Sequence, residues 1–205
     1  MNAIESKVKE ANESNIKVEL ADTKGHWAQK TIDMFVKLHI IDGYEDGKFN
    51  PNGNITRAEF ATIISRVFDI SGASGPVELN DVDSHWAREV IEKLASAGVL
   101  VGYGDGTFKP DKTISREEMV LILSRIVDLD KVNKVASKGN FTDMASASSY
   151  AANQIKDAAE AGIISGKNEG VFDPQGKATR AEALTVVLNM LNLNTQVKTF
   201  LDSLN

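Results

Sequence analysis

The chain has 205 residues, a net charge of −6 and a hydrophobic content of 42%, so it can bury a core as an ordinary globular protein. This acidity argues against nucleic acid as a partner, because phosphate binding needs a concentrated excess of Lys and Arg. No apolar stretch approaches the roughly 20 residues that cross a bilayer, which excludes membrane insertion. Since the chain has no cysteine, it has neither disulfides nor thiolate metal sites.

The two ends of the chain have helical character outside the main pattern. Residues 1–20 are mostly polar and lack the apolar centre of a signal peptide, so the sequence is cytosolic, already processed or produced for expression. Apolar residues such as Val8 and Leu201 recur at helical spacing in residues 1–20 and 195–205. These flanks are either docked on the main domain or the beginnings of further structure.

The strongest pattern is a triplicate. A Thr/Ser-Arg-x-Glu phrase occurs three times, and its arginine always follows an aromatic residue by thirty positions. The pairs are Trp27 with Arg57, Trp86 with Arg116, and Tyr150 with Arg180. We therefore expect three tandem repeat units. Their expected ranges are 21–72, 78–132 and 140–194, joined by the linkers 71–76 and 131–140.

A first helix follows the aromatic residue in each unit. Apolar residues recur there at helical spacing, as in Ile32, Phe35, Val36 and Ile40 of the first unit. Gly98 and Gly162 should end this helix in the second and third units, because glycine adopts the left-handed conformation easily. His39 stands at that place in the first unit, which predicts a different helix end.

A glycine-rich loop follows the first helix of each unit. The loops span residues 42–51, 101–110 and 165–174, and each has two glycines four positions apart. Glycine permits positive φ and the close approach of a ligand or another backbone. A phenylalanine in each loop should anchor it to the core, namely Phe49, Phe108 and Phe172.

A second helix should begin at each arginine phrase. Its apolar residues follow the i, i+3, i+4, i+7 pattern in all three units. Three equivalent helices bury equivalent stripes most simply against one another. The sequence therefore predicts an all-α protein of three helix-loop-helix repeats, with pseudo-threefold symmetry around a central three-helix bundle.

The arginine phrase contains two separate signals. Its Thr or Ser and its Glu form a capping box that starts a helix. The arginine is not needed for capping, and a cation in the first helical turn is slightly unfavourable. It either pairs with a loop carboxylate such as Asp46 or Asp105, or binds an anion together with the free N–H groups of the helix start. The two roles can coexist.

Aromatic residues are the other binding candidates. Trp27, Trp86 and Tyr150 are expected to cover a hydrophobic seam more often than to stack on a ligand. Tyr44 and Tyr103, which lie between glycine and carboxylate residues, look better placed for a sugar. Lys167 takes this place in the third unit, so we expect anion sites at Arg57 and Arg116 and a doubtful one at Arg180.

These ordered elements closely resemble the S-layer homology domain. The resemblance rests on His-Trp-Ala, on the Gly-Tyr-x-Asp-Gly-x-Phe-x-Pro loop and on the Ile-Thr-Arg-Ala-Glu phrase, and it covers residues 21–194. It implies a three-pronged spindle of three repeats around a helical bundle. It also implies a secreted, non-catalytic module that anchors bacterial surface proteins to the wall, with binding grooves between neighbouring repeats.

The resemblance further implies a ligand. Its partner would be an anionic secondary cell-wall polymer that carries pyruvate ketals on N-acetylmannosamine, with peptidoglycan as a second wall polymer to consider. The ketal carboxylate would need a cation, backbone donors and an aromatic or small-residue wall. The candidates are Arg57, Arg116, Arg180, Gly43, Gly102, Gly166, Tyr44, Tyr103, Trp27, Trp86, Asp46 and Asp105.

Three other functions remain open. A polysaccharide-active enzyme needs only a pair of carboxylates, but the sequence has no nucleophile elbow and no His-Glu-x-x-His motif. A calcium loop beginning at Asp42 fails because Tyr44 stands at a ligand position and Gly53 at the twelfth. A purely structural or self-assembly role is the third. No cofactor and no metal are expected.

Overall fold

The computed structural model describes residues 2–14, 17–72, 75, 77–168 and 170–204. Among these residues there are helices, turns and isolated bridges but no β-strand, so the all-α prediction is confirmed. The linker expected at 71–76 lies partly outside the described residues. No helix in the described part of the chain is both long and apolar enough to span a membrane.

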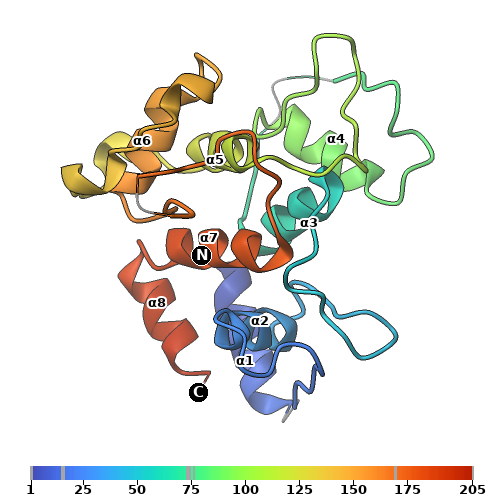
Figure 1. The fold of residues 1–205 in the computed structure, drawn as a ribbon. Coiled ribbons are helices and arrows are strands. Elements are labelled where there is room, and N and C mark those ends of the chain that lie inside the picture. Colours follow the sequence, from blue (N-terminus) through green and yellow to red (C-terminus); the bar gives the residue numbers. More distant parts are fainter. Residues whose placement is uncertain (1, 15–16, 73–74, 76, 169, 205) are drawn as a thin grey trace.

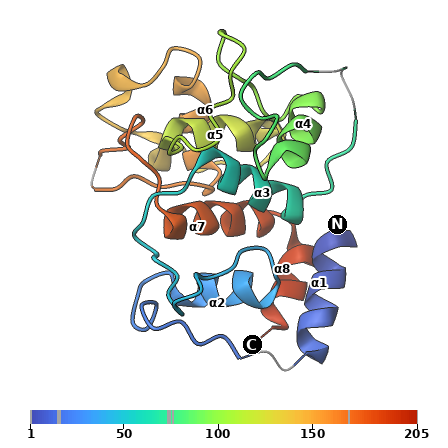
Figure 2. The ribbon, with the colours of Figure 1, turned by 90° about the vertical axis from the view of Figure 1, so that its right-hand side faces the viewer.

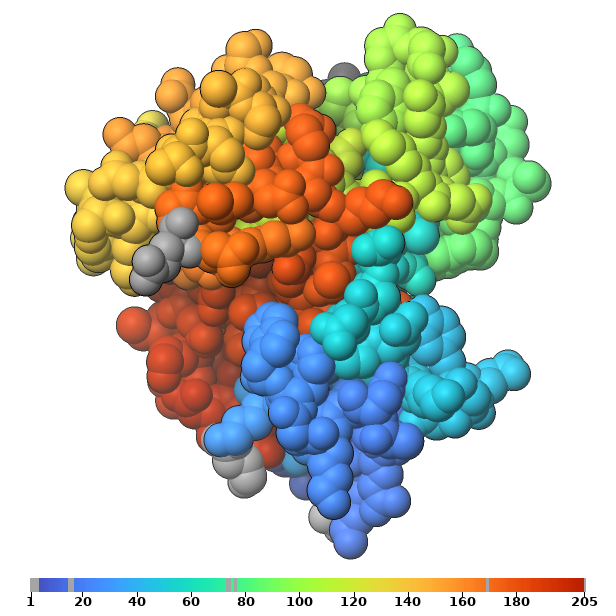
Figure 3. All heavy atoms as spheres, in the orientation of Figure 1, coloured from blue at the N-terminus to red at the C-terminus, as the bar shows by residue number. Residues whose placement is uncertain are grey.

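The same pair of helices occurs three times (Figure 1). Each first helix is nine residues long, and these outer helices are α2 (Gln29–Lys37), α4 (Arg88–Ser96) and α6 (Ala152–Glu160). The second helices lie at the centre, and they are α3 (Arg57–Val67), α5 (Arg116–Ser124) and α7 (Arg180–Leu191). Figure 3 shows the three segments as three lobes, coloured blue to cyan, green, and yellow to orange.

The central helices bury their apolar stripes as predicted. Phe60, Met119 and Val187 are all completely buried in one continuous core. Each central helix also packs against the first helix of the next segment, α3 on α4, α5 on α6 and α7 on α2. The third of these contacts joins the last segment to the first, so the three segments form a closed ring (Figure 2).

A ring of backbone hydrogen bonds closes the same arrangement near the starts of the central helices. The N–H of Ile55 donates to Ala178 O at 3.1 Å, that of Ala178 to Ile114 O at 3.0 Å, and that of Ile114 to Ile55 O at 3.0 Å. All three residues are completely buried. Because every segment both donates and accepts, the ring supports the approximate threefold symmetry that the sequence predicts.

The outer helices end alike, which corrects one expectation. Gly98 and Gly162 have φ of 75° and 76°, and His39 also has a positive φ, 52°. The N–H of the next residue donates to a carbonyl of the helix in the same way in both units. Ile40 N–H donates to Phe35 O at 3.0 Å, and Val99 N–H donates to Leu94 O at 2.9 Å. The prediction of a different end at His39 was therefore wrong, because histidine adopts the left-handed conformation there.

Further helices surround the repeats. α1 (Asn2–Glu13) and α8 (Thr195–Asp202) pack against each other, and α1 also contacts α3. Val8 and Leu201 are buried, so both flanks are docked on the domain. Three short 3-10 helices precede α6, namely η1 (Leu129–Lys131), η2 (Ala136–Gly139) and η3 (Met144–Ser146).

Candidate binding grooves

All three capping boxes are present. Thr56, Ser115 and Thr179 each accept a hydrogen bond from the N–H of the glutamate three positions on, and that glutamate accepts from the N–H of the cap. Such a box satisfies donors that would otherwise be free at the helix start. The capping interpretation of the phrase is confirmed.

The remaining N–H groups of each helix start are also occupied. The N–H of Arg57 donates to Lys112 O and that of Ala58 to Pro110 O, both at 2.9 Å. The other two helix starts make the same bonds to the loop of the next segment. The N–H groups of Arg116 and Glu117 donate to Gly176 O and Pro174 O. Those of Arg180 and Ala181 donate to Gly53 O and Pro51 O. The expectation that these N–H groups would bind an anion was therefore wrong, since the protein itself takes them.

Each arginine of the phrase reaches into the loop of the next segment. Arg57 donates from Nε to Phe108 O at 2.8 Å and from Nη2 to Val101 O at 3.2 Å. Arg116 makes the same bonds to Phe172 O and Ser165 O, and Arg180 to Phe49 O and Asp42 O. These contacts establish which loop belongs to which arginine. All three arginines are at most 5% exposed.

The acidic partner of each arginine is a capping glutamate, not a loop aspartate. Arg57 Nη1 lies 3.0 Å from Glu118 Oε1, and the pairs Arg116–Glu182 and Arg180–Glu59 are both at 3.5 Å. The expected partners Asp46 and Asp105 were wrong. Their carboxylates accept from the N–H groups two positions on and pair with Lys48 and Lys109 within their own loops.

The first glycine of each loop is required by the loop itself. A Cβ at Gly102 would lie 2.7 Å from Thr107 O and 2.9 Å from Leu79 Cδ2. Cβ atoms at Gly43 and Gly166 would also lie within 3.0 Å of the carbonyl oxygen five positions on. Of the two uses expected for these glycines, close backbone approach is the one observed. The loop phenylalanines are completely buried, as predicted.

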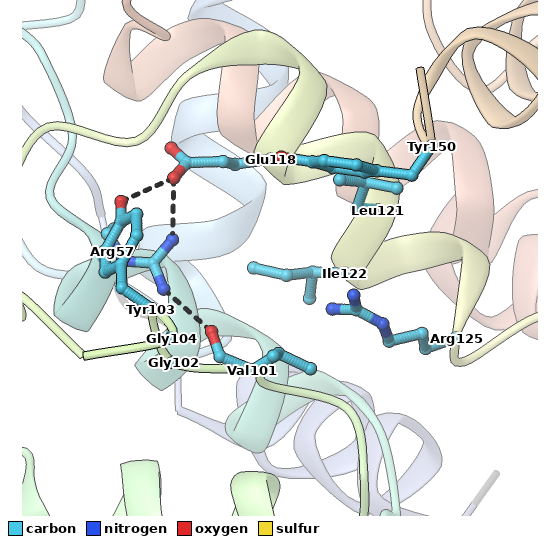
Figure 4. Close-up of a pocket in the computed structure, with 10 residues that line it drawn as sticks. All are labelled: Arg57, Val101, Gly102, Tyr103, Gly104, Glu118, Leu121, Ile122, Arg125 and Tyr150. Atoms are coloured by element: carbon cyan, nitrogen blue, oxygen red, sulfur yellow. Dashed lines mark hydrogen bonds and ion pairs between the residues drawn. The ribbon is translucent and has the colours of Figure 1, made fainter. Parts of the chain in front are cut away.

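A hollow of about 300 Å³ lies beside Arg57 (Figure 4). We call it the Arg57 groove, and all three segments line it. Arg57 comes from the first segment, the loop 101–104 and α5 from the second, and Tyr150 from the third. The lining residues are Arg57, Val101, Gly102, Tyr103, Gly104, Glu118, Leu121, Ile122, Arg125 and Tyr150.

An equivalent hollow of about 310 Å³ lies beside Arg116, and we call it the Arg116 groove. Its wall contains Gly166, Lys167 and Glu182, and Trp27 stands where the Arg57 groove has Tyr150. The threefold relation assigns Tyr44, Glu59 and Trp86 to a third place, the Arg180 groove. In agreement, Arg180 lies 4.9 Å from the centre of the Tyr44 ring.

The three aromatic residues are not part of a hydrophobic seam. Trp27, Trp86 and Tyr150 are 65%, 66% and 65% exposed, so that expectation was wrong. His26 and His85 lie beside the two tryptophans, with ring centres 5.3 Å and 5.2 Å apart and the ring planes tilted by 35° and 37°. Large exposed aromatic faces beside a polar hollow are free to stack on a ligand.

The loop tyrosines differ in their contacts. Tyr103 OH donates to Glu118 Oε1 and accepts from Lys112 Nζ, both at 2.8 Å, whereas Tyr44 is 48% exposed. Lys167, their counterpart, pairs with Asp173 at 2.9 Å. Because its loop faces Arg116, this substitution changes the Arg116 groove. It gives no reason to doubt Arg180, which the sequence interpretation had ranked last.

Burial affects the charged groups of the Arg57 groove. Burial opposes ionisation of Glu118, but the hydrogen bonds from Ser115 N–H and Tyr103 and the charge of Arg57 outweigh it, so the pKa of this carboxyl lies below its ordinary value. Burial and the charge of Arg57 lower the pKa of Arg125, whose guanidinium still remains charged at neutral pH. The groove therefore holds two fixed cations and one carboxylate.

The sequence did not single out Arg125. It stands nine positions after Arg116 and donates from Nη1 to Val99 O at 3.3 Å. Arg66 and Asn189 stand at the same place in the other units and bind the equivalent carbonyls of Ile40 and Ile163. The shared register in the three second helices was the signal that could have found them. In Figure 4 the guanidinium of Arg125 points toward the hollow from the side opposite Arg57.

The Glu117 carboxylate is engaged by hydrogen bonds within the protein. It is 3% exposed and accepts hydrogen bonds from Ser148 N–H at 3.0 Å and Ser148 Oγ at 2.7 Å. His26 and His85 instead accept from the N–H two positions on and contact Asn52 and Asp111 at 3.1 Å. The third segment has no histidine before its aromatic residue. There, the hydrogen bonds from Ser148 to Glu117 hold the stretch before Tyr150 instead.

Comparison with protein families identifies the repeat. Residues 19–61, 78–120 and 140–184 each match the S-layer homology domain. The chain belongs to this family. Membership places the module at the bacterial cell surface, in association with the cell wall, and the resemblance seen in the sequence is confirmed.

Relatives of the S-layer homology module are much longer proteins. The chain is 36% identical to an amylopullulanase of Thermoanaerobacterium thermosulfurigenes and 35% identical to exoglucanase XynX of Acetivibrio thermocellus, each over 83% of its length. It is 34% identical over 63% of its length to a cellulosome-anchoring protein of A. thermocellus. It spans only 9%, 16% and 30% of these proteins. The match to the two enzymes is therefore confined to a small part of each.

Proposed function

We propose that this S-layer homology module is a non-catalytic anchor that holds a surface protein to an anionic cell-wall polymer through its inter-repeat grooves. Polysaccharide-degrading enzymes and a cellulosome-anchoring protein share the module. Such different proteins have a common need for attachment to the wall rather than a common reaction. The single observation that carries the proposal is the Arg57 groove, where two guanidinium groups and an exposed aromatic ring surround one hollow.

The ligand that suits this groove is a sugar with a carboxylate, such as N-acetylmannosamine with a pyruvate ketal. Arg57 makes one hydrogen bond from each of its three nitrogens, which leaves an N–H donor on each of the two terminal nitrogens. Arg125 has no ion pair among the described residues and can meet the same carboxylate from the opposite side. Tyr150 offers a face for the sugar ring.

Weak binding at several grooves would suffice for anchoring. Two or three sites that engage one polymer raise the overall affinity by roughly 10² to 10⁴ through effective concentration, provided their spacing permits it. The threefold arrangement provides such repeated sites on one rigid domain. An enzyme needs one asymmetric catalytic pair instead, so repetition favours binding over catalysis.

Calorimetric titration with pyruvylated and ketal-free N-acetylmannosamine glycosides tests the proposal. We expect binding of the pyruvylated sugar alone, and about a tenfold weaker affinity at this groove in Arg125→Gln, as for loss of a hydrogen bond to a charged group. Arg88→Gln, on the outer face of α4, is the matched control. Equal binding of both sugars would contradict the ketal assignment, binding of peptidoglycan fragments alone would redirect it, and no binding of any wall sugar would favour self-assembly.

A further inference from the structure

We propose that a second hollow beside the Arg57 groove takes a further anionic residue of the same polymer. The Arg57 groove and this second hollow then hold two neighbouring anionic residues between them. This inference rests on the proposed function. The second hollow measures about 390 Å³. It shares Tyr103, Glu118 and Tyr150 with the Arg57 groove. A polymer that leaves the first hollow along Tyr150 therefore enters the second.

The second hollow offers two ammonium groups to a ligand. Lys112 and Lys177 both line it, and Lys177 has no hydrogen bond or ion pair in the part of the chain that the structure describes. Two carboxylates are also present, but each is already engaged. Glu117 is buried against Ser148, and Glu118 binds Arg57 and Tyr103. The free donors are thus ammonium groups, which favour an anionic ligand.

Lys112 connects the two hollows. Its ammonium donates to Tyr103 OH and lies 4.0 Å from Glu118 Oε1. The hydrogen bond to Tyr103 raises the pKa of Lys112, with burial opposing and the charge of Glu118 assisting. Lys112 is therefore charged at neutral pH. Tyr103 and Glu118 line both hollows, and they contact Arg57 in the first and Lys112 in the second.

The other two grooves lack this arrangement. Where the second hollow has Lys112 and Lys177, the threefold relation gives Gly176 and Asn54 beside the Arg116 groove. It gives Gly53 and Thr113 to the Arg180 groove. At the Arg180 groove the Asp42 carboxylate also lies 4.0 Å from Arg66. The equivalent residues of the Arg57 groove are Val101 and Arg125, so Arg125 has no carboxylate at this place. The three grooves are therefore unequal, because two lysines line the hollow beside the Arg57 groove and neither equivalent position at the other two grooves is a lysine.

The test compares two probes by calorimetry. One is the methyl glycoside of pyruvylated N-acetylmannosamine, and the other is a disaccharide in which both residues carry the ketal. We expect the disaccharide to bind the wild-type module about fivefold more tightly, the gain of one favourable exposed ion pair. Lys177→Gln should remove this gain and leave the monosaccharide affinity unchanged. Lys112→Gln should also remove it, whereas Lys198→Gln on α8 should change nothing.

Failure of the inference differs from failure of the proposed function. If neither probe binds, the proposed function is wrong and the inference falls with it. If both probes bind the wild type equally, only the inference is overturned. The inference is also overturned if Lys177→Gln weakens the binding of both probes equally. Such a result would show that Lys177 attracts anions through its charge in general and not at the second hollow. A disaccharide with a neutral second residue that binds as tightly as the dianionic one contradicts the role of charge.

Discussion

Arg57 Nη1 and Glu118 Oε1 lie 3.0 Å apart, although 61 residues separate them along the chain. The first residue of α3 thereby binds the capping glutamate of α5. Arg116 and Glu182 repeat this contact between α5 and α7, and Arg180 and Glu59 repeat it between α7 and α3. The arginine of each phrase therefore ties neighbouring segments into the closed ring and also lines a groove.

Arg57→Ala should destabilise the fold. The change leaves the carbonyls of Phe108 and Val101 without these donors and removes the cation beside Glu118. Breaking a buried pair by removal of one partner costs about 3–5 kcal/mol, a large part of the stability of an ordinary domain. The midpoint of urea denaturation measures the loss. Loss of binding in this variant alone therefore says little about the ligand.

Two other variants calibrate that result. Arg57→Lys keeps the charge but cannot reproduce the bond from Nε to Phe108 O, so it should lose less stability than Arg57→Ala. Arg88 pairs with Glu92 on the surface, and Arg88→Ala should change the midpoint of denaturation little, because exposed ion pairs contribute little to stability. An Arg57→Ala midpoint equal to that of Arg88→Ala would show that the buried contacts contribute nothing.

His39→Gly should stabilise the module. His39 is exposed and has a φ of 52°, a conformation that costs a non-glycine residue about 1–2 kcal/mol. Glycine removes this cost but has a more flexible unfolded chain, so we expect a net gain of about 0.5–1 kcal/mol by urea denaturation. The matched change is Gly98→Ala, where a Cβ meets no atom within 4 Å. It should lose about 1 kcal/mol, and a destabilised His39→Gly would contradict the equivalence of the two helix ends.

The sequence contained most of the fold because the repeat presents each signal three times. The capping boxes of Thr56, Ser115 and Thr179 are local, and they fix where the central helices start. Equal apolar stripes predict equal burial. Helix ends were less predictable, since α5 stops at Ser124 after nine residues whereas the equivalent α3 and α7 have 11 and 12 residues.

The site was less predictable because its contacts join different segments. Nothing within the phrase indicates that Arg57 meets the loop at Val101 or that Tyr150 lines the same hollow. The exposure of Trp27 and Trp86 was hidden for the same reason. Residue type predicted the arginines as candidates, whereas their partners depend on the closed ring of the three segments.

Acid should weaken the module through the aspartates that hold the loops. Asp143 accepts from the N–H groups of Phe172 and Asp173. Burial opposes its ionisation, but these bonds outweigh burial, so the pKa of Asp143 lies below its ordinary value, and that of Asp22 does likewise. A lowered folded pKa gives stability that is complete above the unfolded value of about 4 and is lost as the pH falls through the folded value.

The pH dependence is tested with Asp143→Asn. The amide has one acceptor oxygen and cannot accept from both N–H groups as a carboxylate does. We expect this variant to be less stable at pH 7 and to lose less stability than the wild type between pH 7 and pH 3, by urea denaturation at each pH. Asp83→Asn is the control, because Asp83 is exposed and pairs with Arg88 at the surface. Parallel losses in Asp143→Asn and the wild type would contradict the role of Asp143.

Glu117→Ala should loosen the wall of the Arg57 groove. Alanine stands at this place in the other two units, but here the change leaves Ser148 N–H and Oγ without their acceptor. Because Ser148 is half-buried, loss of these hydrogen bonds should cost about 0.5–1.5 kcal/mol of the free energy of unfolding, measurable by urea denaturation. Ser148→Ala removes only the hydroxyl bond and should cost less. If the double variant loses the sum of the two single losses, the residues are not coupled, and the stretch before Tyr150 must be held by other contacts.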